Sequence, residues 1–207
     1  MTVKRVGRPS NTVARRSQIV EALLSAMASH GYAQATVARI AARAGLASGL
    51  VHYHFENKRQ ILAALIDTLT ARLDARVHER QASTTAPRDR LLAVIDAYVA
   101  RGADADVATV AAWVVIGTEA VRDPEVQGLY AAAVASSLAR LRALTRAVLR
   151  AEGRSAQGAS QISTLLLAAI EGAYRVSAAA PGVMRPGSAA PLLRAVAVTL
   201  LDAVPAS

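Results

Sequence analysis

The 207-residue chain contains no cysteine, one phenylalanine and one tryptophan. The absence of cysteine excludes a disulfide framework and a thiolate metal site, and it fits a reducing cytoplasm. Long hydrophobic runs are also missing, since 165–170 and 195–201 are far shorter than the roughly 20 residues that span a bilayer. The first twelve residues lack the apolar segment of a secretory signal. We therefore expect a cytoplasmic protein without a membrane span.

What the chain has is enough apolar material for a core and an uneven distribution of charge. Hydrophobic residues make up 53% of the sequence. Residues 1–60 hold nine basic and two acidic side chains, whereas the remaining residues hold fifteen and thirteen. A local cationic surface attracts a polyanion because it releases condensed counterions, whatever the sequence of that polyanion. This pattern favours a nucleic-acid partner, although an anionic membrane surface would be attracted as well.

Apolar side chains recur every three or four residues along most of the chain, which indicates amphipathic helices. No alternating run rich in Val, Ile or Thr lies between turn signals, so we predict no strand. The sequence therefore predicts an all-α fold with about nine helices. The predicted helices cover roughly 13–30, 36–44, 47–54, 58–80, 91–102, 106–121, 124–153, 157–180 and 190–204.

The charge asymmetry suggests two domains of unequal size. Residues 1–57 form a basic arm followed by three helices, the last two of which are short, and we expect them to bind DNA. Residues 58–207 form a larger and nearly neutral helical domain. The helix predicted for residues 58–80 is long enough to connect the two.

The segment Thr36–Lys58 has the pattern of two short helices around Gly45, which is typical of a helix-turn-helix. Such a motif places its second helix in the major groove, while the first crosses the phosphates. Small residues at the start of the second helix let its backbone amides approach a phosphate. We expect Leu50 and His52 to face bases and the other contacts to position the backbone. The expected DNA contacts are Arg5, Arg8, Thr36, Val37, Ser48, Gly49, Leu50, His52, Tyr53 and Lys58.

These residues resemble the TetR family of one-component transcriptional regulators over about the first 65 residues of the chain. The resemblance rests on Thr36, Ile40, Ala41, Ala44, Gly45, Gly49, Tyr53, His54, Phe55, Asn57, Lys58 and Leu62. It implies an N-terminal three-helix domain that binds an operator and a larger helical domain that dimerises and binds a small ligand. The chain departs from the family at Ala47, where a capping serine is usual, and at His52, where tyrosine is common. Losing that cap removes about 1 kcal/mol, so we expect Ser48 or a shifted helix start to compensate.

Other chemistries find little support in the sequence. Phe55 is expected to pack in the core. His30, His52, His54 and His78 have no carboxylate or cysteine at ligand spacing, so we expect no metal and no cofactor. The chain has no nucleophile with a base and an orienting group, and it has no phosphate-binding loop, so we do not expect an enzyme.

A ligand site in the larger domain should be apolar with a few polar groups. The C-terminal half is loosely similar to the choline-responsive BetI-like subgroup through WVVIGTEAVRDPEV and LLLAAIEGAYR. Trp113 could equally be core, and Glu171 with Arg175 could equally be an ion pair within one helix. Choline needs an aromatic cage, and aromatics make up only 3% of the chain, so the sequence does not favour choline. The candidate ligand residues are Tyr98, Trp113, Ile116, Glu119, Tyr130, Glu171, Tyr174 and Arg175.

The last two long helices carry small and aliphatic faces suited to a homodimer interface, or alternatively to an internal core. A two-fold partner is expected because two recognition helices must reach half-sites about 34 Å apart. The leading hypothesis is a homodimeric repressor that binds a palindromic double-stranded DNA operator and is released by an unknown small-molecule effector. The alternative is a nonspecific nucleoid-type DNA-binding protein. The interface residues would be Leu165, Leu166, Ala169, Ala173, Leu192, Leu193, Val196 and Leu200.

Overall fold

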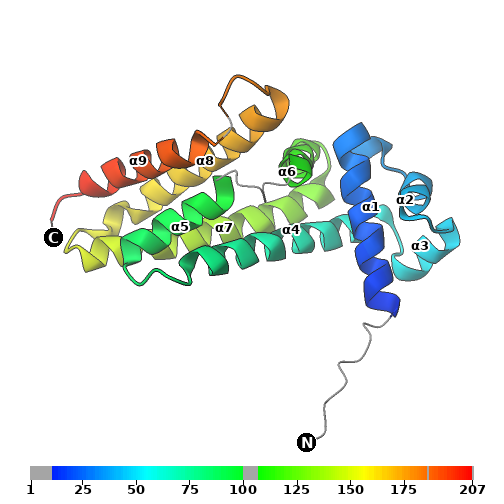
Figure 1. Ribbon diagram of the computed structural model, residues 1–207, viewed down its shortest axis with the longest axis horizontal. Helices are drawn as coiled ribbons and strands as arrows, with labels where there is room; N and C mark the ends of the chain where they lie inside the picture. The colour runs from blue at the N-terminus through cyan, green and yellow to red at the C-terminus, as the bar shows by residue number, and fades with distance from the viewer. Residues whose placement is uncertain (1–10, 100–106, 186, 207) are drawn as a thin grey trace, which may run out of the picture. The chain divides into compact units, whose positions relative to one another are not determined.

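The computed structural model describes residues 11–99, 107–185 and 187–206, and all regular elements in these ranges are helices (Figure 1). The all-α prediction is confirmed for this part of the chain. Arg5, Arg8 and Gly102 lie outside the described residues. The elements are α1 (Asn11–Gln34), α2 (Val37–Ala44), α3 (Ser48–His54), α4 (Lys58–Gln81), α5 (Pro87–Val99), α6 (Val107–Ala120), α7 (Pro124–Ala151), the short 3-10 turn η1 (Ala156–Gly158), α8 (Ala159–Ala179) and α9 (Ala189–Asp202).

The chain forms two compact units, Met1–Asp67 and Thr68–Ser207. The division falls inside α4, C-terminal to the boundary that we expect from the sequence. In the first unit, α1, α2 and α3 pack on one another. In the second unit, α8 packs against α5, α6, α7 and α9.

A break at Gly31 divides α1 near the helix end that the sequence predicts. Regular helical geometry breaks at Gly31, which has φ 74° and ψ 169°, but a further helical stretch continues to Gln34. A residue with a side chain is strained at this positive φ, so glycine suits the position. The helix predicted to end at His30 therefore does end at the break at Gly31, and a second short helical stretch follows it within α1.

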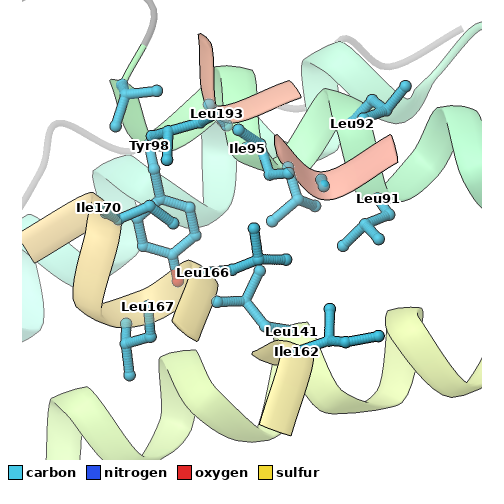
Figure 2. Packing of buried hydrophobic residues seen from close by; sticks show 14 of the residues in the cluster. Leu91, Leu92, Ile95, Tyr98, Leu141, Ile162, Leu166, Leu167, Ile170 and Leu193 are labelled. Carbon is cyan, nitrogen blue, oxygen red and sulfur yellow. The ribbon is translucent and has the colours of Figure 1, made fainter. Parts of the chain in front are cut away.

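The core of the second unit is built around α5. This helix is buried on several faces, because its residues 91–95 and 97–99 are all buried. Figure 2 shows the side chains of α5 meeting those of α7, α8 and α9. Because neighbouring helices surround its second half, that half is apolar except for Asp96, which forms an ion pair with Arg194. The packed side chains labelled there are Leu91, Leu92, Ile95, Tyr98, Leu141, Ile162, Leu166, Leu167, Ile170 and Leu193.

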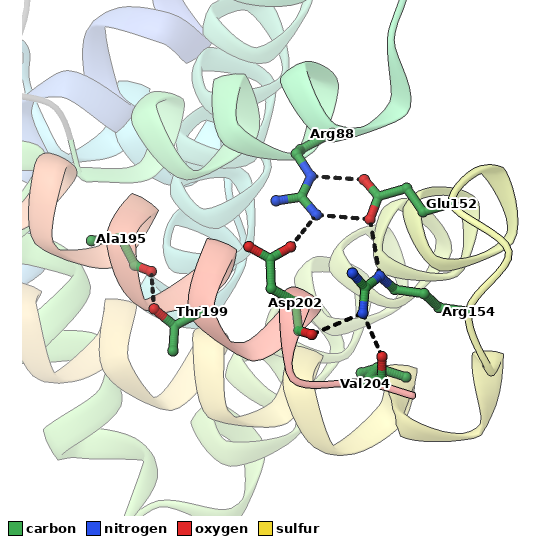
Figure 3. Close-up of polar contacts among 7 residues, drawn as sticks. All are labelled: Arg88, Glu152, Arg154, Ala195, Thr199, Asp202 and Val204. Atoms are coloured by element: carbon green, nitrogen blue, oxygen red, sulfur yellow. Dashed lines mark hydrogen bonds and ion pairs between the residues drawn. The ribbon is translucent and has the colours of Figure 1, made fainter. Parts of the chain in front are cut away.

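A network of ion pairs joins the start of α5 to the ends of α7 and α9 (Figure 3). The Arg88 guanidinium donates to both carboxylate oxygens of Glu152 at 2.7 Å and to Asp202 at 2.6 Å. Arg154 donates to the Asp202 and Val204 carbonyls. The hydrogen bonds from Arg88 hold the pKa of Glu152 and of Asp202 below their ordinary values.

Replacing Arg88 with glutamine should lower the melting temperature at neutral pH by about 2–4 °C, as expected for a partly exposed charge network. Carboxylates with a lowered pKa in the folded state stabilise the fold above their unfolded pKa and lose that effect as the pH falls through the folded value. The difference between wild type and Arg88→Gln should therefore shrink as both carboxylates become protonated. Thermal melts at pH 7 and in acid measure it, and a difference that stays constant would argue against this network.

One segment of the second unit passes a length and composition test for crossing a membrane. Within residues 156–179, a stretch of 18 residues has a mean hydropathy of 1.2, and 28% of that stretch is buried. The prediction from apolar runs alone did not detect this segment, because polar residues interrupt its runs. One such helix is weak evidence for a membrane span, and α8 contributes Ile162, Leu166 and Ile170 to the core.

Candidate DNA-binding surface and ligand cavity

The turn between α2 and α3 is fixed by local hydrogen bonds. The Thr36 hydroxyl accepts a hydrogen bond from the Arg39 amide at 3.3 Å, so Thr36 caps α2. Gly45 ends α2 in the left-handed conformation with φ 62°, and its amide donates to carbonyls at the end of that helix. Any side chain at Gly45 would be strained in this conformation.

The helix α3 begins without a side-chain cap. Ala47 occupies the N-cap position in an extended conformation, and no side chain accepts a hydrogen bond from the first turn. Ser48 is the first helical residue and does not take over the capping role. The expected compensation by Ser48 is therefore wrong.

The side chains of α3 divide into a buried and an exposed set. Val51 is fully buried, and Phe55, just after the helix, is 2% exposed. On the opposite side, Leu50 is 37% exposed and Tyr53 is 79% exposed. The other expected contacts Thr36, Ser48, Gly49 and His52 are exposed too, whereas Val37 is half-buried. The outer face of α3 thus presents small, apolar and aromatic groups.

Much of the positive charge in this unit stabilises the unit itself. The Lys58 ammonium donates to the Tyr32 carbonyl at 2.9 Å and lies 4.0 Å from the centre of the Tyr32 ring. Arg16 donates to the His54 carbonyl and lies 4.0 Å from the centre of the Phe55 ring. Arg43 donates to two serine hydroxyls of α1. Lys58, expected as a DNA contact, therefore has intramolecular partners that the sequence pattern did not indicate.

The second unit contains a cavity of about 520 Å³ lined from α4, α5, α6, α7, α8 and the segment before α9. Tyr98, Trp113, Glu171 and Tyr174, four of the candidate ligand residues, line it. Tyr130 and Arg175 line a smaller pocket of about 160 Å³ that shares Trp113 and Glu171. Ile116 is fully buried in the core and Glu119 lies near the end of α6, so these two are not brought to either space within the described residues.

Glu171 of α8 joins α6 and α7. The indole of Trp113 donates to one carboxylate oxygen at 3.0 Å, and the hydroxyl of Tyr130 donates to the other at 2.9 Å. Burial and the neighbouring Glu171 charge both raise the pKa of Tyr130. Gly117 allows this close approach, because a Cβ there would lie 3.2 Å from the Tyr130 hydroxyl. The Glu171 carboxylate therefore accepts hydrogen bonds from side chains on two other helices. The spacing in the sequence indicated only an ion pair with Arg175 on the same helix.

Several cavity residues could not be found by sequence reasoning. Arg76 comes from α4, Ser137 and Arg140 come from α7, and Met184 comes from the loop before α9. Each looks like an ordinary surface or turn residue in the sequence. In the sequence, Arg140 is followed by Arg142, Arg146 and Arg150, a spacing that indicates only a charged helix face. The signal was missing because the cavity is formed only by tertiary packing.

Among the described residues, no group of three or more His, Asp or Glu side chains could hold a metal ion. His52 and His54 lie on α3, with the His54 ring packed edge-on against Tyr53 at 5.0 Å between ring centres.

Residues 19–65 match the model of bacterial regulatory proteins of the tetR family, and residues 87–202 match that of the BetI-type transcriptional repressor C-terminal domain. The second match alone covers more than half of the chain. The chain belongs to the TetR family. The family and the relatives that it matches are transcriptional regulators, not enzymes, and its C-terminal part is BetI-like.

Curated relatives of this TetR-family chain carry the same description. It is 36% identical over 116 residues to the HTH-type transcriptional regulator BetI of Rhizobium meliloti (strain 1021), a match covering 56% of each protein. It is 38% identical over 87 residues to BetI of Cronobacter sakazakii (strain ATCC BAA-894), covering 40% of this chain and 42% of the relative. The chain thus spans about half the length of these relatives or less.

Solved structures show the same fold. A transcriptional regulator from Rhodococcus sp. Rha1 has a TM-score of 0.77 at 22% identity, covering 91% of this chain and 97% of that one. A protein from Saccharomonospora viridis, solved in complex with choline, has a TM-score of 0.75 at 20% identity, covering 93% of this chain and 99% of that one. These identities support the TetR fold alone.

Proposed function

We propose that this regulator is a cytoplasmic homodimeric repressor that binds a palindromic operator and is released by a small-molecule effector. The observation that carries the DNA-binding role is the outer face of α3. Leu50 and Tyr53 are exposed on it, while Val51 and Phe55 fix the helix from below. A recognition helix needs this combination of a free outer face and a firmly packed inner one.

The dimer is supported by an apolar face on the last two helices. Leu165 of α8 is 50% exposed, and Leu192 and Val196 of α9 are 62% and 42% exposed. The helices α8 and α9 pack on each other, so these aliphatic side chains belong to neighbouring elements. Covering such side chains with a second copy would remove apolar surface from water. Leu166 and Leu193, also expected at the interface, lie in the internal core instead.

The effector site is supported by the cavity of the second unit. Its volume of about 520 Å³ is in the range of small-molecule sites, and its wall combines apolar side chains with Trp113, Tyr98 and Glu171. The choline complex of the related Saccharomonospora viridis protein shows that a protein with this fold can hold a small organic molecule. A ligand that favours one arrangement of the helices would shift the spacing of the two recognition helices.

The experiment that tests this function starts with selection of bound fragments from genomic DNA by the full chain. Operator affinity is then measured by gel shift with and without candidate effectors. A palindromic preferred site, and affinity that falls when an effector is added, are expected. Equal affinity for selected and random duplex would instead favour the alternative of a nonspecific nucleoid-type protein.

A further inference from the structure

The charge of the cavity wall indicates what kind of molecule it accepts. The charged side chains that line it are Arg76, Glu79, Arg80, Arg140, Glu171 and Arg185, so positive charges outnumber negative ones. Arg76 and Arg140 are half-buried, whereas Arg80 and Arg185 are exposed. The two half-buried guanidiniums are therefore the cationic groups least screened by water.

Neither of these guanidiniums is fully satisfied by the protein. Arg76 donates through Nε to the neutral carbonyl of Ala97 at 3.2 Å, and within the described residues no carboxylate forms an ion pair with it. Arg140 donates through Nη2 to Asp74, but its Nη1 is enclosed and has no hydrogen-bond partner. A buried charged donor without an acceptor is unfavourable, so a ligand oxygen that turns the guanidinium toward itself would be stabilised.

Two tyrosines, Tyr98 and Tyr174, line the same cavity as these guanidiniums. Burial raises the pKa of Tyr98, whereas the neighbouring Ser137 hydroxyl and the positive charge of Arg140 act to lower that pKa. Burial also raises the pKa of Tyr174, and the Arg76 charge opposes it. The Tyr174 hydroxyl donates to the Tyr98 carbonyl at 2.9 Å, so the two tyrosines are linked. Both arginines thus act on one connected part of the cavity.

Glu171, the less exposed of the two carboxylates in the wall, is less available to a cation than its charge suggests. Both oxygens of Glu171 already accept hydrogen bonds from Trp113 and Tyr130. A ligand ammonium would have to compete with these donors and would also face the nearby guanidiniums. The apolar part of the wall, which includes Leu73, Val110 and Met184, remains available to a hydrophobic body.

We propose that the effector is an organic anion, a carboxylate on an apolar or aromatic body, whose oxygens are bound by Arg76 and Arg140. This inference rests on the proposed function, because it names the chemical class of the effector for that cavity. The planar guanidinium suits a carboxylate, since it can donate two parallel hydrogen bonds. The serine hydroxyl of Ser137 on the same wall supplies a further donor.

Three probes of nearly equal size test the sign of charge: phenylbutyrate, its neutral amide and the corresponding phenylbutylamine. Trp113 is the single tryptophan of the chain and lines the cavity, so its fluorescence reports binding directly. The acid should bind at least about tenfold more tightly than the amide, as expected for a charge-assisted hydrogen bond, and the amine should bind most weakly.

Variants of the two arginines test where the carboxylate of the probe binds. Arg76→Gln and Arg140→Gln should each reduce the preference for the acid over the amide, whereas Arg140→Lys should retain part of it. Arg146→Gln is the matched control, because Arg146 is an exposed arginine of α7 outside the cavity lining. Circular dichroism of every variant checks folding, and the ratio of acid to amide affinity is independent of modest losses of stability.

Equal binding of the amide, tighter binding of the amine, or no saturable response to the acid in the millimolar range would overturn the proposal. Operator release is measured separately with the same probes. An acid that binds near Trp113 but never weakens operator binding supports the anion site and contradicts the ligand response. Release by cationic compounds alone supports the ligand response and contradicts the anion site.

Discussion

Phe55→Ala should destabilise the N-terminal unit by about 3–5 kcal/mol, because it removes a ring that is almost completely buried. Tyr53→Ala, two residues earlier, should change stability by no more than about 0.5 kcal/mol, since Tyr53 is 79% exposed. The two variants should weaken DNA binding for different reasons, Phe55→Ala through loss of folding and Tyr53→Ala through loss of a contact. Tyr53→Ala should leave the protein folded but weaken operator binding about tenfold or more, because it removes a contact with the DNA backbone.

Guanidinium denaturation and gel shifts on both variants measure this contrast. Phe55→Leu is the conservative control, because it keeps most of the apolar volume and should retain both stability and binding. Unchanged operator affinity in Tyr53→Ala, with the protein folded, would remove Tyr53 from the proposed contact surface. A stable Phe55→Ala protein would contradict the packing of α3 described above.

Introducing charge on the exposed face of the last two helices should separate the proposed dimer. In a two-fold assembly, Leu165→Glu together with Leu192→Glu would place four unpaired carboxylates at the interface, and burying such charges is strongly unfavourable. Operator affinity should fall by about a hundredfold or more, because binding through two linked half-sites becomes binding through one.

Sedimentation and operator titration of this double variant test the prediction. Val121→Glu is the control, since Val121 is likewise a strongly exposed aliphatic residue but follows α6 and belongs to neither α8 nor α9. The control should remain dimeric with normal operator binding. A double variant that stays dimeric would show that the interface lies elsewhere on the second unit.

The parts of the fold that local chemistry determines could be predicted from the sequence. Thr36 and Asn57 are capping residues whose side chains accept hydrogen bonds from the next turn, so they mark helix starts without tertiary information. Gly45 marks a helix end because only glycine takes its left-handed conformation without strain. The helix-turn-helix is made of such local signals, so its residues resembled a known family.

The parts that depend on tertiary packing could not be predicted. Lys58 looks like a cation free to bind phosphate, but a carbonyl and a ring contributed from α1 hold it. Glu171 has Arg175 four residues away on its own helix, yet its oxygens bond donors on α6 and α7. The spacing along one helix identifies possible partners on that helix and gives no information about competing donors on others.

The same reason limits what aromatic content reveals about a ligand. The few aromatic residues of the chain argued against a cation-binding cage, but composition did not indicate that Trp113, Tyr98 and Tyr174 would line one cavity. Nor did it show that Arg76 and Arg140 would reach the same wall. The sign of charge in the cavity is therefore a property of the folded chain.

The central claim is sequence-specific DNA binding, and one comparison tests it most directly. Fluorescence anisotropy with the full chain measures Kd for the duplex selected from genomic DNA and for a shuffled duplex of equal length, at about 150 mM salt to suppress nonspecific attraction. The selected duplex should bind at least about a thousandfold more tightly. Equal Kd values for the two duplexes would contradict operator recognition by α3.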